Sequence, residues 1–154
     1  MDKSKMMDAM KASISEVLEQ MFFLPVDFSV PDATPSELEA EQASIIAKLE
    51  FSGSPGGIFL LRVPAALAHS VSADFLGIPP PNLADDQVAG TILEMANMLA
   101  GSTLSTYDPH ALFDLQIPQL IQDQDESAMA GDIPDRIIIR IQTPESRMTF
   151  QLIT

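Results

Sequence analysis

The chain has 154 residues, 46% hydrophobic and 19% charged, which is enough apolar material for a sizeable core. Its formal net charge of -14 disfavours both nucleic acid and anionic membranes as partners. The absence of cysteine excludes disulfides, thiolate metal sites and a cysteine nucleophile. No apolar run reaches the roughly 18 residues of a membrane-spanning helix, and the first residues do not resemble a secretory signal. We therefore expect a single domain, residues 1–154, in the cytoplasm.

The N-terminal region is expected to form a helix followed by a short strand and a loop. Residues 4–23 have helical spacing of apolar side chains, with Ser4 as the N-cap. The apolar face of this helix consists of Met7, Met10, Ile14, Val17, Leu18 and Met21. Residues 26–30 are consistent with a short strand. Residues 31–42 are rich in Pro, Ser and Glu and are expected to form a loop.

The next segment predicts a β-hairpin and a helix. Residues 44–52 alternate between two faces, and residues 58–63 form a second apolar run. The glycine-rich residues 53–57 between them are typical of a turn. A phosphate-binding loop is the alternative, but the GK[ST] sequence of such a loop does not follow. Residues 64–76 predict a helix that ends before Gly77.

Residues 82–105 predict one long helix, the element around which the fold is expected to form. Asn82 suits the N-cap, and Asp85 and Asp86 in the first turn interact favourably with the helix dipole. A metal site at this aspartate pair is the alternative, and capping is the commoner role. An apolar arc roughly 180° wide predicts burial against a sheet. The arc consists of Val88, Ala89, Ile92, Leu93, Met95, Ala96, Leu99, Ala100 and Leu104.

The opposite face of this helix is a narrow stripe of small and polar residues. The stripe consists of Gln87, Gly90, Glu94, Asn97, Gly101 and Ser105. Each glycine in a helix interior costs about 1 kcal/mol relative to alanine. Glu94 and Asn97 are three residues apart, so their side chains project side by side. We therefore expect this stripe to be approached closely by a binding partner.

The C-terminal third predicts further strands. Residues 112–121 contain a strand interrupted by Pro118, and residues 136–142 and 148–153 form two more. Residues 123–132 are acidic and are expected to form a solvated loop; cation binding is the alternative, but the spacing does not match an EF-hand. The order of elements predicts an α/β (α+β) two-layer sandwich, with a largely antiparallel sheet packed on long helices.

The usual catalytic motifs are missing from the sequence. His69 and His110 are the two histidines, and neither belongs to an HExxH motif. No GxSxG, dinucleotide or Walker motif is present. An amide such as that of Asn97 can hold a water molecule, and a carboxylate such as that of Glu94 can pair with a partner's cation. Spacing alone equally fits two ordinary solvent-facing residues.

The run from Glu94 to Gly101, EMANMLAG, resembles the ExxN signature of the CheC/CheX/FliY chemotaxis phosphatases. It is most similar to the CheX branch, in which a Glu, an Asn and a Gly have this spacing in a long helix. The segment EVLEQMFFLPVDF at 16–28 also resembles the opening of that family, and the hairpin at 43–63 has the expected place. The resemblance implies a single CheX-like domain with the CheC-like fold.

The resemblance also implies an activity and a partner. The substrate would be the aspartyl phosphate of a CheY-type response regulator, with Asn97 orienting the attacking water and Glu94 contacting a lysine of the regulator. No cofactor of its own is implied, because the regulator would supply Mg²⁺. The family also implies a homodimer, and the strand-rich C-terminal part offers an edge for sheet extension. No nucleic acid or membrane partner is expected.

Three features are compared with the family pattern, and Gly90 is the clear departure. Gly90 stands four residues before Glu94, where the family often has Asp or Ser. Pro118 lies near the spacing of a proline that is common in the family. One ExxN site is found, where CheC-type members carry two, and this again favours the CheX branch. Because of Gly90, a non-catalytic adaptor that binds a receiver domain or a flagellar switch component is the alternative function. A small-molecule binding domain has little support in the sequence.

Overall fold

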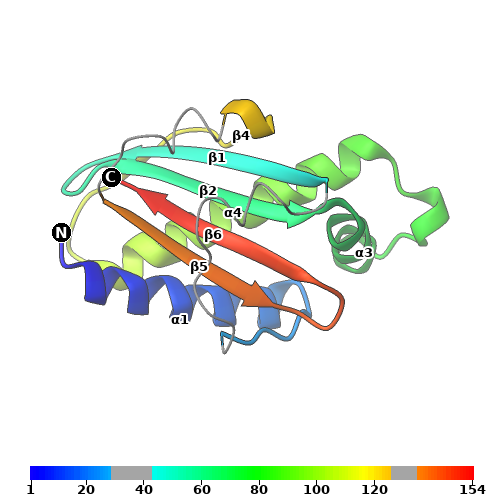
Figure 1. Cartoon of the computed structure of the whole chain (residues 1–154), viewed down its shortest axis with the longest axis horizontal. Coiled ribbons are helices and arrows are strands. Elements are labelled where there is room, and N and C mark those ends of the chain that lie inside the picture. Colours follow the sequence, from blue (N-terminus) through cyan, green and yellow to red (C-terminus); the bar gives the residue numbers. More distant parts are fainter. Residues whose placement is uncertain (29–42, 126–134) are drawn as a thin grey trace.

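Residues 1–28, 43–125 and 135–154 are described from a computed structural model, in which helices cover one face of a twisted sheet (Figure 1). The helices are α1 (Lys3–Met21), α3 (Ala65–Leu76), the short 3-10 helix η1 (Pro80–Asn82) and α4 (Asp85–Tyr107). The strands are β1 (Ser44–Ser52), β2 (Gly57–Pro64), β3 (Asp114–Leu115), β4 (Gln119–Ile121), β5 (Arg136–Gln142) and β6 (Arg147–Ile153).

The sheet is antiparallel throughout, in the order β3-β1-β2-β6-β5, and β4 also pairs with β1. The predicted hairpin is confirmed: β1 and β2 pair along their length, with Ile46 opposite Arg62, and residues 53–56 form the turn. The predicted strand interrupted by Pro118 is β3 and β4. The two-layer α+β sandwich is therefore confirmed.

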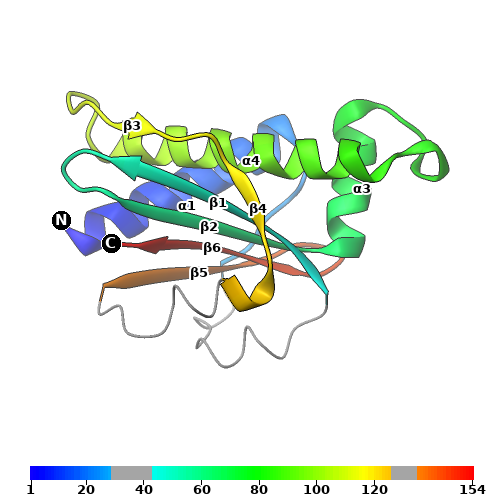
Figure 2. The same cartoon turned by 90° about the horizontal axis from the view of Figure 1, so that it is seen from above.

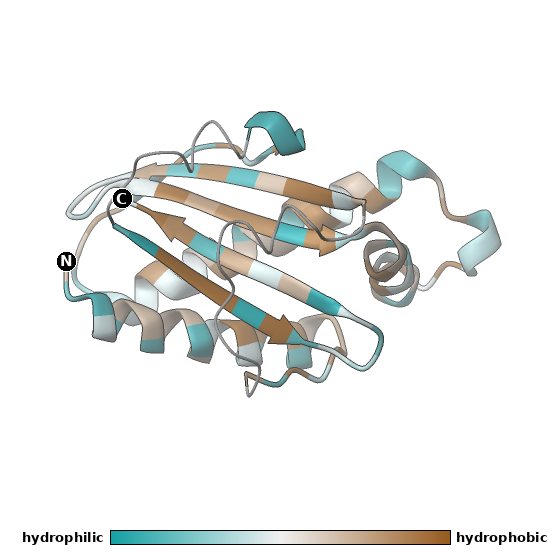
Figure 3. Cartoon of the chain, in the orientation of Figure 1, coloured by the Kyte–Doolittle hydropathy of each residue, from teal (hydrophilic) through white to brown (hydrophobic). Residues whose placement is uncertain are grey.

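The main core lies between the sheet and the helices α1 and α4. Alternate residues of β1, namely Ala47, Leu49 and Phe51, are buried in it, as the alternation predicts. The brown apolar positions on all the long strands are visible in Figure 3. Aromatic rings line up across the strands, because the ring centroids of Phe51 and Phe59 lie 5.0 Å apart and those of Phe59 and Phe150 lie 5.1 Å apart. Such offset pairs add to the burial energy of the sheet face.

Helix α4 lies along the sheet beside α1, as the view from above shows (Figure 2). The predicted apolar arc is buried except for Ala89 and Leu93, which are half-buried. Three further residues are buried beside the arc: Thr91, Thr103 and Tyr107. In the part of the chain that the structure describes, no helix combines the length and apolarity needed to cross a bilayer.

The start of α4 differs from the prediction. Asn82 is not the N-cap: it ends η1, and its N–H donates to the Pro79 carbonyl at 2.9 Å. The prolines before it have φ fixed near the helical value and so favour this separate short turn. Helix α4 instead begins after Ala84, whose N–H donates to Oε1 of Gln87 at 2.9 Å. Asp85 and Asp86 occupy its first turn, as predicted.

Helix α1 also differs from the prediction at both ends. Its N-cap is Asp2 and not Ser4, because the Asp2 carboxylate accepts from the N–H of Lys5 at 3.1 Å. A carboxylate is a strong capping acceptor, so the helix starts one residue earlier than expected. The helix ends at Met21 and not at residue 23, with Phe22 as its C-cap, and Phe23 follows with φ of +55°. Met21 is 46% exposed and is not part of the apolar face.

The other predictions for residues 4–42 can be compared with the structure in part. Met7 is half-buried, whereas the other predicted members of the apolar face, apart from Met21, are buried. In the proposed strand at 26–30, Asp27 forms an isolated bridge to Gln142. Residues 29 and 30 and the predicted loop at 31–42 lie outside the described residues.

Thr103 offers a test of packing in α4. Its Oγ1 is buried and has no hydrogen-bond partner among the described residues, whereas Oγ1 of the buried Thr91 donates to the Gln87 carbonyl at 2.8 Å. Burying an unpaired hydroxyl costs about 1–3 kcal/mol. Thr103→Val should therefore raise the free energy of unfolding in urea by about 1 kcal/mol. Thr91→Val is the matched control and should not stabilise; a loss of stability in Thr103→Val would contradict the packing described here.

Candidate functional site

The predicted stripe lies on the outer face of α4, away from the sheet. Gly90, Glu94, Asn97 and Ser105 are exposed, and Gly101 is half-buried. This face is outward because the opposite one is buried in the core. The helix therefore presents a carboxylate and an amide side by side to solvent, on a rigid support.

A groove runs beside this stripe and encloses about 420 Å³. One wall is α4, which contributes Gly90, Leu93, Glu94 and Asn97. The other wall is formed by the end of β3 and the segment that follows it, and its lining residues are Leu115, Gln116, Ile117 and Pro118. Glu94 carries the one ionisable side chain among these lining residues. The groove is thus a mostly apolar channel with one carboxylate and one amide from α4.

The second wall is a β-bulge. In the strand pairing, Phe51 faces Leu115, whereas Lys48 faces Gln119. Two residues of β1 therefore oppose three residues, 116–118, of the outer chain. One extra residue on an edge strand bends the strand and re-aims its side chains. Pro118 explains why the bulge forms here, because a proline cannot donate to the ladder.

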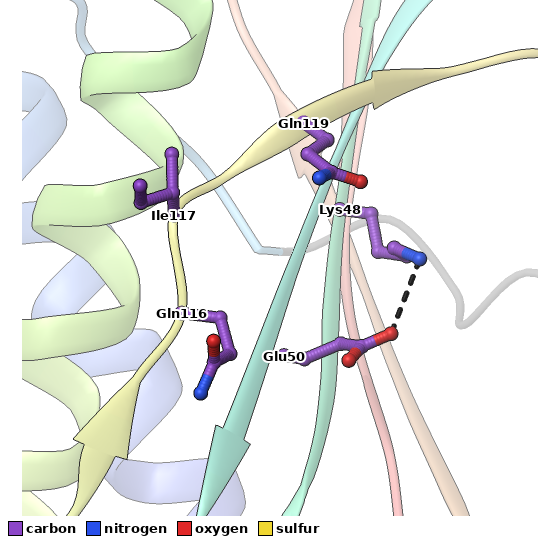
Figure 4. A pocket seen from close by; sticks show the side chains of 5 residues that line it. All are labelled: Lys48, Glu50, Gln116, Ile117 and Gln119. Atoms are coloured by element: carbon purple, nitrogen blue, oxygen red, sulfur yellow. Dashed lines mark ion pairs between the residues drawn. The ribbon is translucent and has the colours of Figure 1, made fainter.

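The bulge sends neighbouring side chains to opposite sides. Figure 4 shows that Ile117 points toward α4. Its side chain is 83% exposed. Gln116 lies with Lys48, Glu50 and Gln119 around a second hollow of about 250 Å³ (Figure 4), to which Ile117 also contributes. Nζ of Lys48 lies 3.1 Å from Oε1 of Glu50. The N–H of Gln116 donates to the Glu50 carbonyl at 2.8 Å, which ties the bulge to β1.

The other predicted partner-binding residues do not all share the groove. Gly101 and Ser105 line a separate hollow of about 230 Å³ at the end of α4, together with Asp108 and Leu112. Gln87 lines none of the three hollows, because its side chain is bound to the N–H of Ala84 at the start of the helix. The structure therefore gathers Gly90, Glu94 and Asn97 into one site.

The two glycines of the stripe are not required by packing within the described residues. A Cβ atom built on Gly90 or on Gly101 meets no atom within 4 Å. Both helix positions have space for a side chain, yet both carry the residue that costs the helix about 1 kcal/mol. Internal packing therefore gives no reason for either glycine, whereas a partner that comes close to the helix would give one.

Sequence reasoning missed the wall formed by residues 115–118. Pro118 was recognised as an interruption of the strand, but its consequence for Ile117 was not. A proline inside a strand pattern is itself a signal of an edge strand or a bulge. The strand order, which places this bulge beside α4, cannot be predicted from the local sequence.

The remaining candidate groups lie apart from the groove. His69 is in α3 and His110 follows α4. Asp123, at the start of the acidic segment, lies 3.0 Å from the guanidinium of Arg62, and residues 126–134 are outside the described residues. Among residues 1–28, 43–125 and 135–154, no three His, Asp or Glu side chains are grouped so as to hold a metal ion.

The comparison with protein families identifies the class to which this fold and site belong. The family model for the chemotaxis phosphatase CheX matches residues 45–141, which include β1, β2, α4 and the bulge. The chain belongs to the CheX family, as its ExxN segment suggested. No curated protein sequence matches the chain.

Solved structures of similar fold come from the same family. CheX from Desulfovibrio desulfuricans is 16% identical, with a TM-score of 0.71 over 97% of this chain and 99% of the other. CheX from Vibrio vulnificus is 16% identical, with a TM-score of 0.69 over 99% and 98%. A chain of the CheX–CheY–BeF3–Mg²⁺ complex from Borrelia burgdorferi is 14% identical, with a TM-score of 0.67 over 97% and 95%. The predicted CheC-like fold is therefore confirmed.

The open space at Gly90 gives a test of the site geometry. Gly90→Ala should raise the free energy of unfolding by about 1 kcal/mol, because alanine is the better helix former and its Cβ enters open space. Gly57→Ala is the contrasting variant, since a Cβ there would lie 2.6 Å from the Ile153 carbonyl oxygen, and it should destabilise the chain. Urea unfolding measures both. A destabilised Gly90→Ala protein would show that the position is crowded.

Proposed function

We propose that the chain dephosphorylates the aspartyl phosphate of a CheY-type response regulator in chemotaxis signalling. The observation that carries the proposal is the exposure of Glu94 and Asn97 in one groove of α4, at the spacing of the family signature. Membership of the CheX family supports the reaction class. The Borrelia burgdorferi relative, crystallised with CheY, BeF3 and Mg²⁺, supports the choice of partner.

Asn97 is the proposed catalytic residue. Its side-chain amide has one acceptor and two donor positions, so it can hold a water molecule in a fixed orientation. The water oxygen attacks phosphorus in line with the aspartyl oxygen, the bond between phosphorus and that oxygen breaks, and the carboxylate leaves with the electron pair. Inorganic phosphate is released. Phosphoryl transfer of this kind depends on positioning and charge stabilisation, for which an amide is sufficient.

Glu94 is the proposed docking residue. Its carboxylate is exposed and lies one helical turn from Asn97, so it can pair with a lysine of the regulator while the amide faces the phosphate. The chain supplies no metal in this proposal; Mg²⁺ bound to the regulator neutralises charge on the phosphoryl oxygens. Gly90 leaves room for the regulator in the same groove, while Gly101 and Ser105 would contact it further along the helix.

Removal of the amide tests the catalytic role. Asn97→Ala should lower the rate constant for phosphate release from a phosphorylated receiver domain about 100-fold. Without the amide the attacking water is no longer held in line with phosphorus, and most of the rate enhancement from alignment is lost. Binding of the receiver should change little. The matched control is Asn82→Ala, which removes another exposed amide from η1 and should leave the rate unchanged. Equal rates for wild type and Asn97→Ala would contradict the role given to Asn97.

A second candidate function is a non-catalytic adaptor of the same fold, and Gly90 is the observation that favours it. The family often has Asp or Ser at this position, and a side chain here would line the groove next to Glu94. In the adaptor case the chain binds the phosphorylated receiver without shortening the phosphate lifetime. Gly90→Ser would then be expected to create or raise phosphatase activity, since the position has space for the side chain.

We also propose that the chain forms a homodimer by sheet extension at β5. Strand β5 pairs with β6 on one side, and on its other side Asp27 alone pairs with it among the described residues. Such an edge has backbone groups available for another strand. Because Gln142 pairs outward with Asp27, alternation directs the N–H of Ile138 outward too.

The dimer is tested by sedimentation equilibrium. Wild type should have the mass of two chains, and Ile138→Pro should have the mass of one, because it removes an outward N–H and leaves the pairing with β6 intact. Ile138→Thr, which keeps the N–H and the β-branched shape, is the control and should remain dimeric. A monomeric wild type would exclude the proposed homodimer.

A further inference from the structure

We propose that the bulge at residues 116–118 is a second docking element for the receiver domain, with Ile117 as its apolar contact. The inference rests on the proposed function, because the partner is the receiver domain that α4 would engage. Ile117 is a large apolar side chain that is 83% exposed and lines the groove that holds Glu94 and Asn97. The Glu and Asn of the ExxN signature lie on α4, and the family proline near this spacing corresponds to Pro118, so neither assigns a role to Ile117.

The bulge holds Ile117 on a rigid support. On one side, the N–H of Gln116 donates to the Glu50 carbonyl at 2.8 Å; on the other, Gln119 pairs with Lys48 of β1. Pro118 fixes its own φ and restricts the residue before it, which is Ile117. A segment whose backbone is already restricted loses less conformational entropy when a partner covers it. An exposed isoleucine held in this way is suited to binding.

The composition of the groove defines the surface that would fit it. Four of its side chains are apolar, and Glu94 is the single charge among the lining residues. The apolar side chains are those of Leu93, Leu115, Ile117 and Pro118. The complementary surface is an apolar patch next to a cation. A receiver whose lysine pairs with Glu94, and whose phosphorylated aspartate faces Asn97, lies over α4 and so reaches the opposite wall of the same groove. We therefore expect an apolar patch of the receiver beside its phosphorylation site to cover Ile117.

The expected energetic pattern differs from that of a catalytic residue. Ile117 touches neither the water nor the phosphate, so its contact is made equally in the ground state and the transition state. Loss of such a contact raises KM and leaves kcat unchanged. A central apolar contact of this kind is typically worth about tenfold in affinity. Ile117 is thus a specificity-determining residue and not a catalytic one.

The experiment measures binding and turnover separately, on the full chain with a phosphorylated receiver domain. Ile117→Ala should raise KM and the dissociation constant about tenfold, with kcat within about twofold of wild type. Ile117→Val keeps most of the apolar surface and should behave like wild type. Phe23→Ala is the matched control: it removes an apolar side chain that is 70% exposed and lies outside the groove, and it should change neither constant.

The outcomes distinguish this inference from the proposed function. An unchanged KM and dissociation constant in Ile117→Ala would overturn the docking role of Ile117 and would not contradict the proposed phosphatase activity. Tenfold weaker binding by Ile117→Ala, together with a wild type that does not shorten the phosphate lifetime, would support the docking role and overturn the phosphatase. A change in the mass of the assembly on Ile117→Ala would show that a second copy of the chain, and not a receiver, covers this wall.

Discussion

The packing of α4 on the antiparallel sheet is the contact on which the rest of the structure depends. Ile92, Met95 and Leu99 are fully buried there, and each buried side chain of this size contributes about 1.5–3 kcal/mol of burial energy. This burial fixes the rotation of the helix about its axis. A helix rotated by a third of a turn would bury Glu94 or Asn97 without partners, at a cost of several kcal/mol. The core thus keeps the carboxylate and the amide directed outward, although neither residue takes part in it.

The edge of the sheet supplies the second wall of the groove, opposite α4. A helix face alone is convex and offers little surface for discrimination between partners. The bulge at 116–118 adds a second wall that is supported by β1. The helix wall carries the one carboxylate of the groove, and the edge wall carries the apolar side chains of Ile117 and Pro118. Since both walls rest on the same β1–β2 hairpin and core, their separation is set by the packing of the domain and not by a loop.

Much of this arrangement was predictable from residue patterns, and the misses have physical causes. The stripe of α4 followed from helical periodicity, because the period of 3.6 residues sorts buried from exposed positions directly. The cap at Asn82 was wrong because the adjacent prolines form their own short turn, and the cap at Ser4 was wrong because the carboxylate of Asp2 competes for the same N–H groups. The groove was not predictable, since it depends on the strand order and on a one-residue shift of register beside Pro118. Apart from Pro118, no local sequence feature indicates these long-range strand pairings.

The exposure of Glu94 and Asn97 has a consequence for the proposed reaction. In the free chain Glu94 and Asn97 face water, so neither is preorganised by burial, and the amide gains its effect when a docked receiver excludes solvent from the groove. Docking and catalysis then have separate residues: the apolar wall at Ile117 decides how much of the receiver is bound, and Asn97 acts on the receiver that is bound. A chain with this design needs no unusual side-chain chemistry of its own. Under the proposed function, selectivity among receivers resides in the shape of the groove, whose glycine and bulge positions can vary without disturbing the core that orients α4.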